Sequence, residues 1–413
     1  MSVPQSEPET PVMPPTSGPG PLLLFDAAAD GHHPEYVQHL VGGAVARGRT
    51  QDVVLAVPET MLAARPSLTA GGIQAFPLPA APSFTSPWAA SRFQWDLLSE
   101  AVRAIRPSRV LLLYADSVIP TLARHARLPG HPGLWTVHFR PPVHDRGARL
   151  RERVRDVVKR RQLRAVLRHP DLRTAFTLDP RALAYFQTQA RTARTVALAD
   201  PVTYAERSPK QQAEDRERIR RELGVRPGRH LMVLFGSLEP RKGIFQTVEA
   251  LQHLRVGVSE RLTVALVGPV YAGCREAFAE VMAAAERATA AQLLLDDRVV
   301  GQSEIAALLV AADTVLLPYQ RHIGSSAVLI RAAGLQRPTI TQDVGLVGQW
   351  TRTHRLGRTV DSTSPRALAR AMEDALAAPA GAFDCDAAQA FAAEHTPEAF
   401  VRALLDGPAG ALP

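Results

Sequence analysis

The sequence predicts an α/β protein with two Rossmann-like domains, each a parallel sheet covered by helices. Two observations carry this prediction. Short apolar runs of strand length alternate along the 413 residues with longer segments in which apolar residues recur at helical spacing. The chain is also too long for one typical core and suits two domains of ordinary size.

The first half contains these elements in regular alternation. Residues 1–20 are rich in proline, serine and acidic side chains, and we expect them to form a disordered tail. Residues 21–200 are the predicted N-terminal domain. Its expected strands are 22–26, 53–57, 110–114, 135–139, 175–178 and 195–198, and its clearest helices are 34–47 and 95–105.

A highly charged segment, 200–222, follows and is predicted to be the hinge before a second domain at 201–383. The expected strands of that domain are 231–235, 262–268, 312–318 and 338–341, and its helices are 246–254, 327–333 and 365–376. Strands that alternate with helices imply a parallel sheet with right-handed crossovers. Such sheets bind ligands beyond the carboxyl ends of their strands, so the loops at those ends are the candidate sites.

The loop at 236–243 is the first candidate, because it is a glycine turn between an apolar strand and a helix. Backbone amides at such a turn and the positive end of the next helix dipole can hold a phosphate. The chain has only three lysines, Lys159, Lys210 and Lys242, so a lysine in this loop points to a phosphate contact. An ordinary strand-to-helix turn is the alternative.

The loop at 319–326 is the second candidate, because it follows another buried strand of the same domain. Gly324, Ser325 and Ser326 offer unobstructed amides and two hydroxyls to an anion. Capping of the next helix by the serines is the alternative, since serine is a strong N-cap residue. If both loops lie at the carboxyl edge of one sheet, we expect them to face one ligand.

These loops and their spacing resemble the C-terminal half of the GT-B glycosyltransferases, specifically the large retaining family 4. The matching segments are 236–254, 262–268, 298–301, 312–318, 324–338 and 357–376. The resemblance implies a GT-B fold, in which two Rossmann-like domains face each other across a cleft and close about the hinge. It also implies that the last segment, 384–413, is a C-terminal helix that packs back on the N-terminal domain.

The resemblance further implies a glycosyltransferase that moves a sugar from a nucleotide-sugar to a glycan or lipid-linked acceptor in cell-envelope polysaccharide or glycolipid synthesis. Retention of configuration is expected, with the donor's own phosphate oxygen taking the acceptor proton and Lys242 stabilising the departing diphosphate. No bound cofactor and no metal are expected. The residues assigned to the donor are Gly236, Ser237, Arg241, Lys242, Val299, Val300, His322, Gly324, Ser325, Ser326 and Arg331.

The chain departs from the family pattern at three of its positions. Ile323 and Arg331 stand where family members carry two glutamates, and Ser237 stands where an arginine is usual. A guanidinium only donates hydrogen bonds, so Arg331 cannot accept them from ribose hydroxyls as the second glutamate does. Arg241, Arg321 and His322 are the candidates to replace the missing cationic contact with the phosphate. These departures favour the alternative function, a non-catalytic GT-B-like protein that binds a glycan or a partner enzyme.

The N-terminal domain is expected to hold the acceptor. Gly31 allows a close approach of the backbone after the first strand, and His32 or His33 can hydrogen-bond a hydroxyl or a phosphate. Capping of the following helix by these histidines is the alternative. In many relatives a histidine at the matching strand end faces the transferred sugar, so His138 is assigned as a catalytic contact and Arg140 to the acceptor. A buried histidine bonded to a backbone carbonyl is the alternative for His138.

Composition favours a cytoplasmic protein, with peripheral contact at the inner face of a membrane as an option. The two cysteines, Cys274 and Cys385, are far apart and argue against a disulfide framework or a cysteine-rich metal site. No apolar run approaches the ~20 residues that span a bilayer. The basic run 149–168 predicts an amphipathic helix that contacts anionic lipid. The equally weighted alternative is a solvated helix in a chain of formal charge +8. Nucleic acid is not expected, because the run lacks interleaved aromatic residues.

Overall fold

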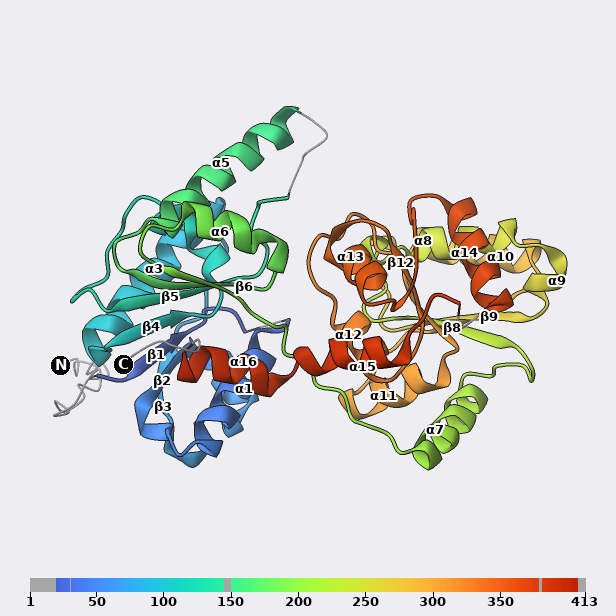
Figure 1. Cartoon of the computed structure of the whole chain (residues 1–413), viewed down its shortest axis with the longest axis horizontal. Helices are drawn as coiled ribbons and strands as arrows, with labels where there is room; N and C mark the ends of the chain where they lie inside the picture. Colours follow the sequence, from blue (N-terminus) through green and yellow to red (C-terminus); the bar gives the residue numbers. More distant parts are fainter. Residues whose placement is uncertain (1–19, 30, 145–149, 379–380, 408–413) are drawn as a thin grey trace, which may run out of the picture. The chain divides into compact units, whose positions relative to one another are not determined.

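The computed structural model describes residues 20–407 apart from 30, 145–149 and 379–380. The predicted tail, 1–20, therefore lies almost wholly outside the described residues. The chain divides into a first unit, residues 1–199 with 398–413, and a second unit, residues 200–397. Each unit is a parallel sheet with helices on both faces (Figure 1), which confirms the predicted α/β class with two Rossmann-like domains.

The first unit contains a seven-stranded sheet in the order β3-β2-β1-β4-β5-β6-β7, with parallel pairing throughout. Its strands are β1 (Leu22–Phe25), β2 (Val53–Pro58), β3 (Gln74–Leu78), β4 (Arg109–Leu112), β5 (Gly133–His138), β6 (Leu172–Thr177) and β7 (Arg194–Ala197). Its helices are α1 (His33–Ala46), α2 (Glu59–Ala64), α3 (Pro87–Ile105), α4 (Ile119–Leu122), α5 (Leu150–Leu167) and α6 (Leu183–Gln189). The strand order reverses between β1 and β4, so the carboxyl ends of these two neighbouring strands form the switch point.

The second unit contains a six-stranded sheet in the order β10-β9-β8-β11-β12-β13, again parallel. Its strands are β8 (His230–Phe235), β9 (Leu262–Val267), β10 (Gln292–Asp296), β11 (Thr314–Leu317), β12 (Thr339–Gln342) and β13 (Gly357–Val360). Its helices are α7 (Pro209–Glu222), α8 (Ile244–Ala250), α9 (Val256–Ser259), α10 (Arg275–Ala288), α11 (Gln302–Ala311), α12 (Ala327–Gly334), α13 (Gly345–Thr353), α14 (Pro365–Ala377) and α15 (Cys385–Glu394). Here the switch point lies between β8 and β11.

Both faces of each sheet are buried, which explains why the strands appear in the sequence as continuous apolar runs. In β8, Leu231 and Val233 face a core formed with α7, α11, α12 and α15. Met232 and Leu234 face the opposite core, formed with α8, α10 and α14. The alternation of side chains along a strand therefore feeds two separate cores, and the carboxyl edge is left to the loops.

Most of the predicted hinge segment is the helix α7. It begins with a capping box in which the Ser208 hydroxyl accepts the Gln211 amide, and the Gln211 side chain accepts the Ser208 amide. Only Ile219 of the helix is buried. Arg216 and Arg220 both bond to the carboxylate of Asp313, so ion pairs rather than an apolar stripe hold α7 to the unit.

The end of the chain differs from the prediction that 384–413 packs as a whole on the N-terminal domain. The helix α15 belongs to the second unit, where Ala388, Phe391 and Ala392 are buried in the same core as α12. Residues from 398 onward belong to the first unit, beginning within α16 (Pro397–Val401), and they place Phe400 and Leu404 in the core beside α1. The segment is thus divided between two cores, because apolar residues occur on both sides of its break.

Within the described ranges, no helix combines the length and the apolar character that crossing a bilayer requires.

Candidate functional site

The loop after β8 is shaped by two glycines. Gly236 has a φ of +110° and Gly243 a φ of +77°, and both values favour glycine. A Cβ on Gly243 would overlap the carbonyl oxygen of Pro318, so this loop lies directly against the loop after β11. Between the glycines, the 3₁₀ turn Pro240–Lys242 places the Lys242 Nζ 3.4 Å from the position that a Cβ on Gly236 would take.

Lys242 connects the two loops. Its Nζ donates to the Tyr319 hydroxyl at 3.2 Å and lies 4.6 Å from the centroid of that ring. The Tyr319 hydroxyl in turn lies 3.0 Å from the Ser326 Oγ, which caps α12 by accepting the amide of Leu329. Among the described residues, no carboxylate lies within ion-pair distance of Lys242. The loops therefore meet as expected, around an ammonium whose charge no side chain compensates.

Backbone amides without a described acceptor occur in both loops. In the loop after β8, the amides of Gly236, Lys242 and Gly243 donate to backbone carbonyls, whereas no described acceptor bonds those of Ser237 and Arg241. In the loop after β11, no described acceptor bonds the amides of residues 324–326. These amides lead into the N-terminus of α12, where the helix dipole favours negative charge. An anion held at that N-terminus would thus take its cation from one loop and its amides from the other.

The shape of the second loop is set by Gln342 at the end of β12. The fully buried Gln342 side chain accepts the amide of His322 at 3.1 Å and donates to the carbonyl of the same residue. His322 Nε2 lies 2.8 Å from the carbonyl oxygen of Ser325, and only a protonated nitrogen can bond a carbonyl. The predicted donor contact His322 therefore holds the loop from within. Arg321 is exposed and has a φ of +55°.

A short stretch at the start of the second unit, 200–204, lies along α12. The Ser325 hydroxyl donates to the Asp200 carboxylate at 2.5 Å. The Arg331 Nε donates to the carbonyl of Thr203 at 3.1 Å, and Arg331 is only 8% exposed. Arg331, a predicted donor contact, thus bonds the beginning of the segment that was predicted to be the hinge.

Further contacts continue along the same stretch. A Cβ on Gly334 would lie 2.6 Å and 2.7 Å from the Cε atoms of the Tyr204 ring, so position 334 cannot hold a larger residue without displacing that ring. The amide of Val202 donates to the carbonyl of His395 at 3.0 Å, just after α15. The stretch 200–204 is therefore an integral layer of the second unit.

Two other residues assigned to the donor lie at the surface of the first loop. Arg241 Nη2 bonds the Glu239 carboxylate at 2.5 Å, so its charge is largely compensated. Ser237 is exposed and makes no side-chain hydrogen bond among the described residues. Ile323, at a position where the family pattern has a glutamate, is 39% exposed.

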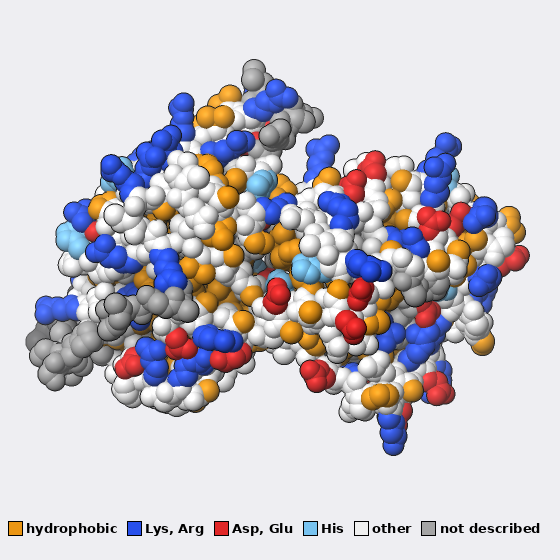
Figure 2. All heavy atoms as spheres, in the orientation of Figure 1, with side chains coloured by type: hydrophobic (Ala, Val, Ile, Leu, Met, Phe, Trp, Pro, Cys, Tyr) orange, Lys and Arg blue, Asp and Glu red, His pale blue; other side chains and the backbone are white. Residues whose placement is uncertain are grey.

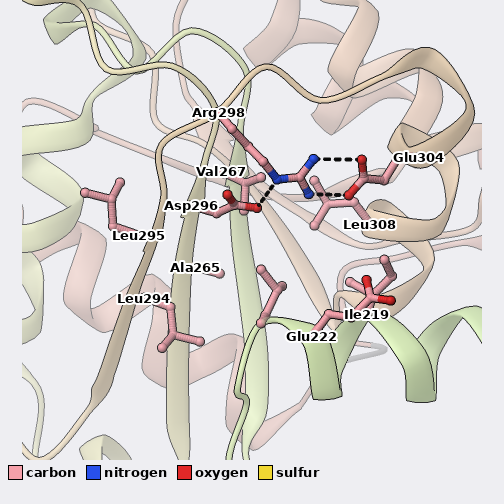
Figure 3. Close-up of a pocket in the computed structure, with 11 residues that line it drawn as sticks. Ile219, Glu222, Ala265, Val267, Leu294, Leu295, Asp296, Arg298, Glu304 and Leu308 are labelled. Carbon is pink, nitrogen blue, oxygen red and sulfur yellow. Dashed lines mark hydrogen bonds and ion pairs between the residues drawn. The ribbon is translucent and has the colours of Figure 1, made fainter.

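A cavity of about 420 Å³ opens beside the loop that contains Val299 and Val300. Figure 3 shows Arg298 at one end of it, between Asp296 and Glu304, with Ile219 and Glu222 of α7 across from it. The bond to Glu304 raises the pKa of Arg298 further and lowers the pKa of Glu304, so this end of the cavity stays a closed ion pair. Val299 is 78% exposed, whereas Val300 packs against the core.

In the first unit, polar and aromatic side chains gather at the switch point. Asp26 directly follows β1 and bonds His33, the first residue of α1, with 2.7 Å between Oδ2 and Nδ1. Tyr114, just beyond β4, lies edge-on to the His33 ring at 4.7 Å and to Phe139 at 5.0 Å. Burial raises the pKa of Tyr114, and the charge of Asp116 raises it further.

The three residues expected at the start of α1 are placed as follows. His32 is the N-cap of α1 but forms no side-chain cap bond, so the capping alternative is wrong for this residue. Its exposed ring stacks on His33 at 4.7 Å and lies 4.9 Å from Phe139. Gly31 has a φ of +62°, and nothing lies within 4 Å of the position of its missing Cβ. Its positive φ shows that the turn itself favours glycine at this position.

His138 is fully enclosed in this structure, so its side chain is not placed to touch a sugar. Its Nε2 lies 3.1 Å from the Thr136 hydroxyl, and Phe186 meets its ring edge-on at 5.3 Å. Its Nδ1 faces Asp116 Oδ1 at 3.5 Å without a hydrogen bond. The other oxygen of Asp116 accepts the amide of the exposed Arg140 at 3.0 Å. The buried alternative describes His138 better, although its partner is a hydroxyl rather than a backbone carbonyl.

The residues that sequence reasoning missed share one signal. Asp26, Tyr114 and Tyr319 each come within two residues of the end of a buried strand, where an open sheet places its ligands. Asp200 carried no such signal, because its partner Ser325 is 125 positions away. Among the described residues, no group of three metal-ligating side chains is suited to a metal ion.

Comparison with known proteins finds a family model that is similar to the second unit. The family model described as "Glycosyl transferases group 1" matches residues 229–378, which include both loops of the second unit. A comparison with curated protein sequences finds no match.

Several solved structures are similar over nearly the whole chain. Alr3699/HepE of Anabaena, solved with UDP and glucose, is 13% identical, with a TM-score of 0.65, 94% of this chain covered and 98% of that one. WaaG, a glycosyltransferase of lipopolysaccharide biosynthesis, is 16% identical, with a TM-score of 0.63 and coverage of 94% and 100%. Sucrose-phosphate synthase of Thermosynechococcus elongatus is 17% identical, with a TM-score of 0.66 and coverage of 92% and 96%.

At these identities the structural likeness establishes the fold, and the family model identifies the second unit. The expected resemblance to GT-B proteins of the family 4 type is confirmed. Residues 229–378 of the second unit match the glycosyl transferases group 1 model, and the chain is a glycosyltransferase with the GT-B fold.

Proposed function

We propose that the second unit binds the diphosphate of a nucleotide-sugar between Lys242 and the amides of residues 324–326, and that the sugar passes to an acceptor held by the first unit. The observation that carries this proposal is the bonded series Lys242, Tyr319 and Ser326, which ends where those amides begin. A lysine with only neutral partners keeps its full attraction for an anion. A helix N-terminus with unbonded amides supplies the second half of such a site.

The finer features of the proposal follow from the resemblance. We expect retention of configuration, with the donor's own phosphate oxygen taking the acceptor proton. The acceptor is a glycan or a lipid-linked sugar, and the pathway is the synthesis of cell-envelope polysaccharide or glycolipid. The Anabaena neighbour was solved with UDP, so a uridine diphosphate sugar is the first donor to test.

Transfer in this proposal needs no bound cofactor and no metal. Negative charge develops on the leaving diphosphate in the transition state, and a preorganised ammonium with fixed amides stabilises that charge without rearrangement. Lys242 is thus the one residue assigned both to donor binding and to catalysis.

We place the protein in the cytoplasm, at the inner face of the membrane. The support is the helix α5, where Val154 (57% exposed), Val157 (47%) and Val158 (48%) lie on one exposed face. Exposed basic side chains flank these valines, namely Arg151, Arg153, Arg155, Lys159, Arg161 and Arg164. Figure 2 shows Lys and Arg side chains gathered over this part of the first unit. An apolar stripe between cations suits the boundary of an anionic lipid surface.

The experiment is calorimetric titration of the protein with UDP, GDP, ADP and TDP and their sugar nucleotides. Lys242→Ala is expected to weaken the binding of the preferred series by roughly 10- to 100-fold, the loss of one charge-assisted contact. Lys210→Ala is the matched control, because Lys210 is 86% exposed on α7, and Glu214 is its one ion-pair partner among the described residues. Its affinity should equal that of the wild type.

Two outcomes would contradict the proposal. Equal nucleotide affinity in the wild type and Lys242→Ala would remove Lys242 from the donor site. The absence of binding in every series, by a protein that remains folded, would overturn nucleotide-sugar transfer by this chain.

A further inference from the structure

A cation without a counter-ion lies at the amino edge of the sheet in the first unit, opposite to the edge that carries the switch point. Arg109, the first residue of β4, is half-buried, and no hydrogen bond or ion pair joins its guanidinium to another described residue. Burial lowers the pKa of Arg109, and the charge of Arg49 lowers it further. A charge that is withdrawn from water without a partner is costly, so this position calls for an anion.

The Arg109 guanidinium is held in place by an aromatic ring. Its central carbon lies 4.3 Å from the centroid of the Trp135 ring, which belongs to the neighbouring strand β5 (Figure 1). Trp135 is itself only 5% exposed, so the ring is a fixed platform. The indole covers one face of the guanidinium, and the N–H groups stay available in the plane of the group.

A second arginine approaches on the other side of Gly133. The register of the sheet sets Arg109 opposite Gly133 of β5, and a Cβ on Gly133 would lie 3.2 Å from the Cγ of Arg173 in β6. Arg173 is exposed and has no hydrogen bond or ion pair to another described residue. Because Gly133 has no side chain, the two arginines flank a stretch of bare backbone.

Two carboxylates at this edge of the sheet are already paired with other cations. Asp171, directly before β6, bonds Arg127 at 2.6 Å, and this bond lowers the pKa of Asp171. Asp406 bonds Arg49 at 3.3 Å. The charges of both carboxylates are therefore compensated, whereas the two arginines beside Gly133 keep their full attraction for an anion.

We propose that Arg109 and Arg173 bind a phosphate-type dianion, either free phosphate or the phosphate group of a small phosphomonoester. The planar fork of a guanidinium suits two oxygens of one tetrahedral anion. Two cations without a compensating carboxylate favour a dianion over a monoanion. The site lies in a different unit from Lys242, so it is separate from the proposed binding of the donor diphosphate, and it has no part in the transfer itself.

The test is NMR titration of the full chain with isotope-labelled tryptophan. The chain has four tryptophans, and Trp135→Phe identifies the indole N–H signal that reports on this site. Inorganic phosphate and methyl phosphate are the probes, and acetate at the same ionic strength is the monoanion. We expect a saturable shift of the Trp135 signal with a phosphate probe, and roughly tenfold weaker binding of acetate.

Two variants remove the proposed contacts one at a time. Arg109→Gln keeps part of the side chain but removes its charge, and it should weaken phosphate binding by roughly 10- to 100-fold. Arg173→Gln, at an exposed position that leaves the packing on Trp135 unchanged, should weaken it by roughly tenfold. Phosphate should also raise the Tm of the wild type, and this rise should shrink in both variants.

Two further variants serve as controls. Arg287→Gln removes the same charge from an exposed position on α10 of the second unit, so it should leave phosphate affinity unchanged. Lys242→Ala should leave the response of Trp135 unchanged even if nucleotide binding is lost, which separates this proposal from the donor site.

The outcomes decide the proposal as follows. No saturable response of Trp135 to either phosphate probe would overturn it. Equal affinity in the wild type, Arg109→Gln and Arg173→Gln would also overturn it, as would acetate binding as tight as that of phosphate. Tighter binding of methyl phosphate would identify a phosphomonoester as the ligand, and tighter binding of inorganic phosphate would identify the free ion; both orders support the site.

Discussion

Replacing Gly243 with alanine tests whether the two loops of the donor site are held together by backbone contact. The φ of Gly243 is +77°, a conformation that costs an L-residue ~1–2 kcal/mol. A Cβ there would overlap the carbonyl oxygen of Pro318 and lie 3.0 Å from its carbon. Relief of that overlap requires the loops to separate, which we estimate at a further ~1–3 kcal/mol from the cost of overpacked cores.

Gly228→Ala measures the cost of the positive φ alone, without a steric overlap. Gly228 has a nearly equal φ of +72°, precedes β8, and has nothing within 4 Å of the missing Cβ. The free energy of unfolding should fall by ~1–2 kcal/mol in Gly228→Ala and by ~2–5 kcal/mol in Gly243→Ala. Denaturant unfolding measures both losses.

Nucleotide binding supplies a second readout. A separation of the loops would break the 3.2 Å contact between Lys242 and Tyr319, so Gly243→Ala should also lose roughly tenfold in nucleotide affinity, whereas Gly228→Ala should lose none. The reasoning is refuted if the two variants are equally stable, because the contact with Pro318 would then carry no energy.

Three further predictions follow from other contacts. Arg331→Ala removes a nearly buried side chain and its bond to Thr203, so the free energy of unfolding should fall by ~1–3 kcal/mol while the nucleotide affinity stays unchanged. A loss of nucleotide affinity at constant stability would instead assign Arg331 to the donor site. Burial, partly opposed by Asp313, lowers the pKa of His230 below 6.5, so the unfolded chain binds the proton first and stability falls as the pH drops below about 6.5. In urea unfolding, the free energy of unfolding of His230→Gln should fall less at acid pH than that of the wild type. The same pH profile in both proteins would contradict this role of His230. Joint replacement of Arg151, Arg155 and Arg161 by glutamine should lower the affinity for phosphatidylglycerol vesicles, measured by co-sedimentation, by roughly 100-fold, at about 1 kcal/mol per cation. High salt should weaken the binding of the wild type in the same way. Equal binding of the variant and the wild type would argue against α5 as the membrane contact.

The fold was predictable because each central strand is buried on both faces. The apolar run 231–235 appears as β8 within one residue, since no polar side chain is needed on either side of it. The strand β3 escaped prediction because it is an edge strand that contains Pro77 and is largely half-exposed. The helix α7 escaped because ion pairs hold it, although its capping box at Ser208 was visible in the sequence.

The candidate site was predictable in its position but not in its partners. A glycine turn after a buried strand identifies the loop that holds Lys242, whatever the rest of the fold. The Tyr319 hydroxyl that receives Lys242 comes from a loop 77 positions later, so only the folded sheet brings the two together. The burial of His138 was not predictable, because the end of a strand does not reveal whether a neighbour such as Phe186 covers the ring.

The layer formed by residues 200–204 decides where a truncated protein should begin. A fragment that starts at the first strand of the second sheet would lack the carbonyl that receives Arg331 and the ring that covers Gly334. It would also leave Ser325, beside the unbonded amides, without the Asp200 carboxylate. A fragment that is meant to carry nucleotide binding by itself should therefore run from Asp200 through the end of α15. Its shorter counterpart should precipitate or lose affinity even though every strand is present.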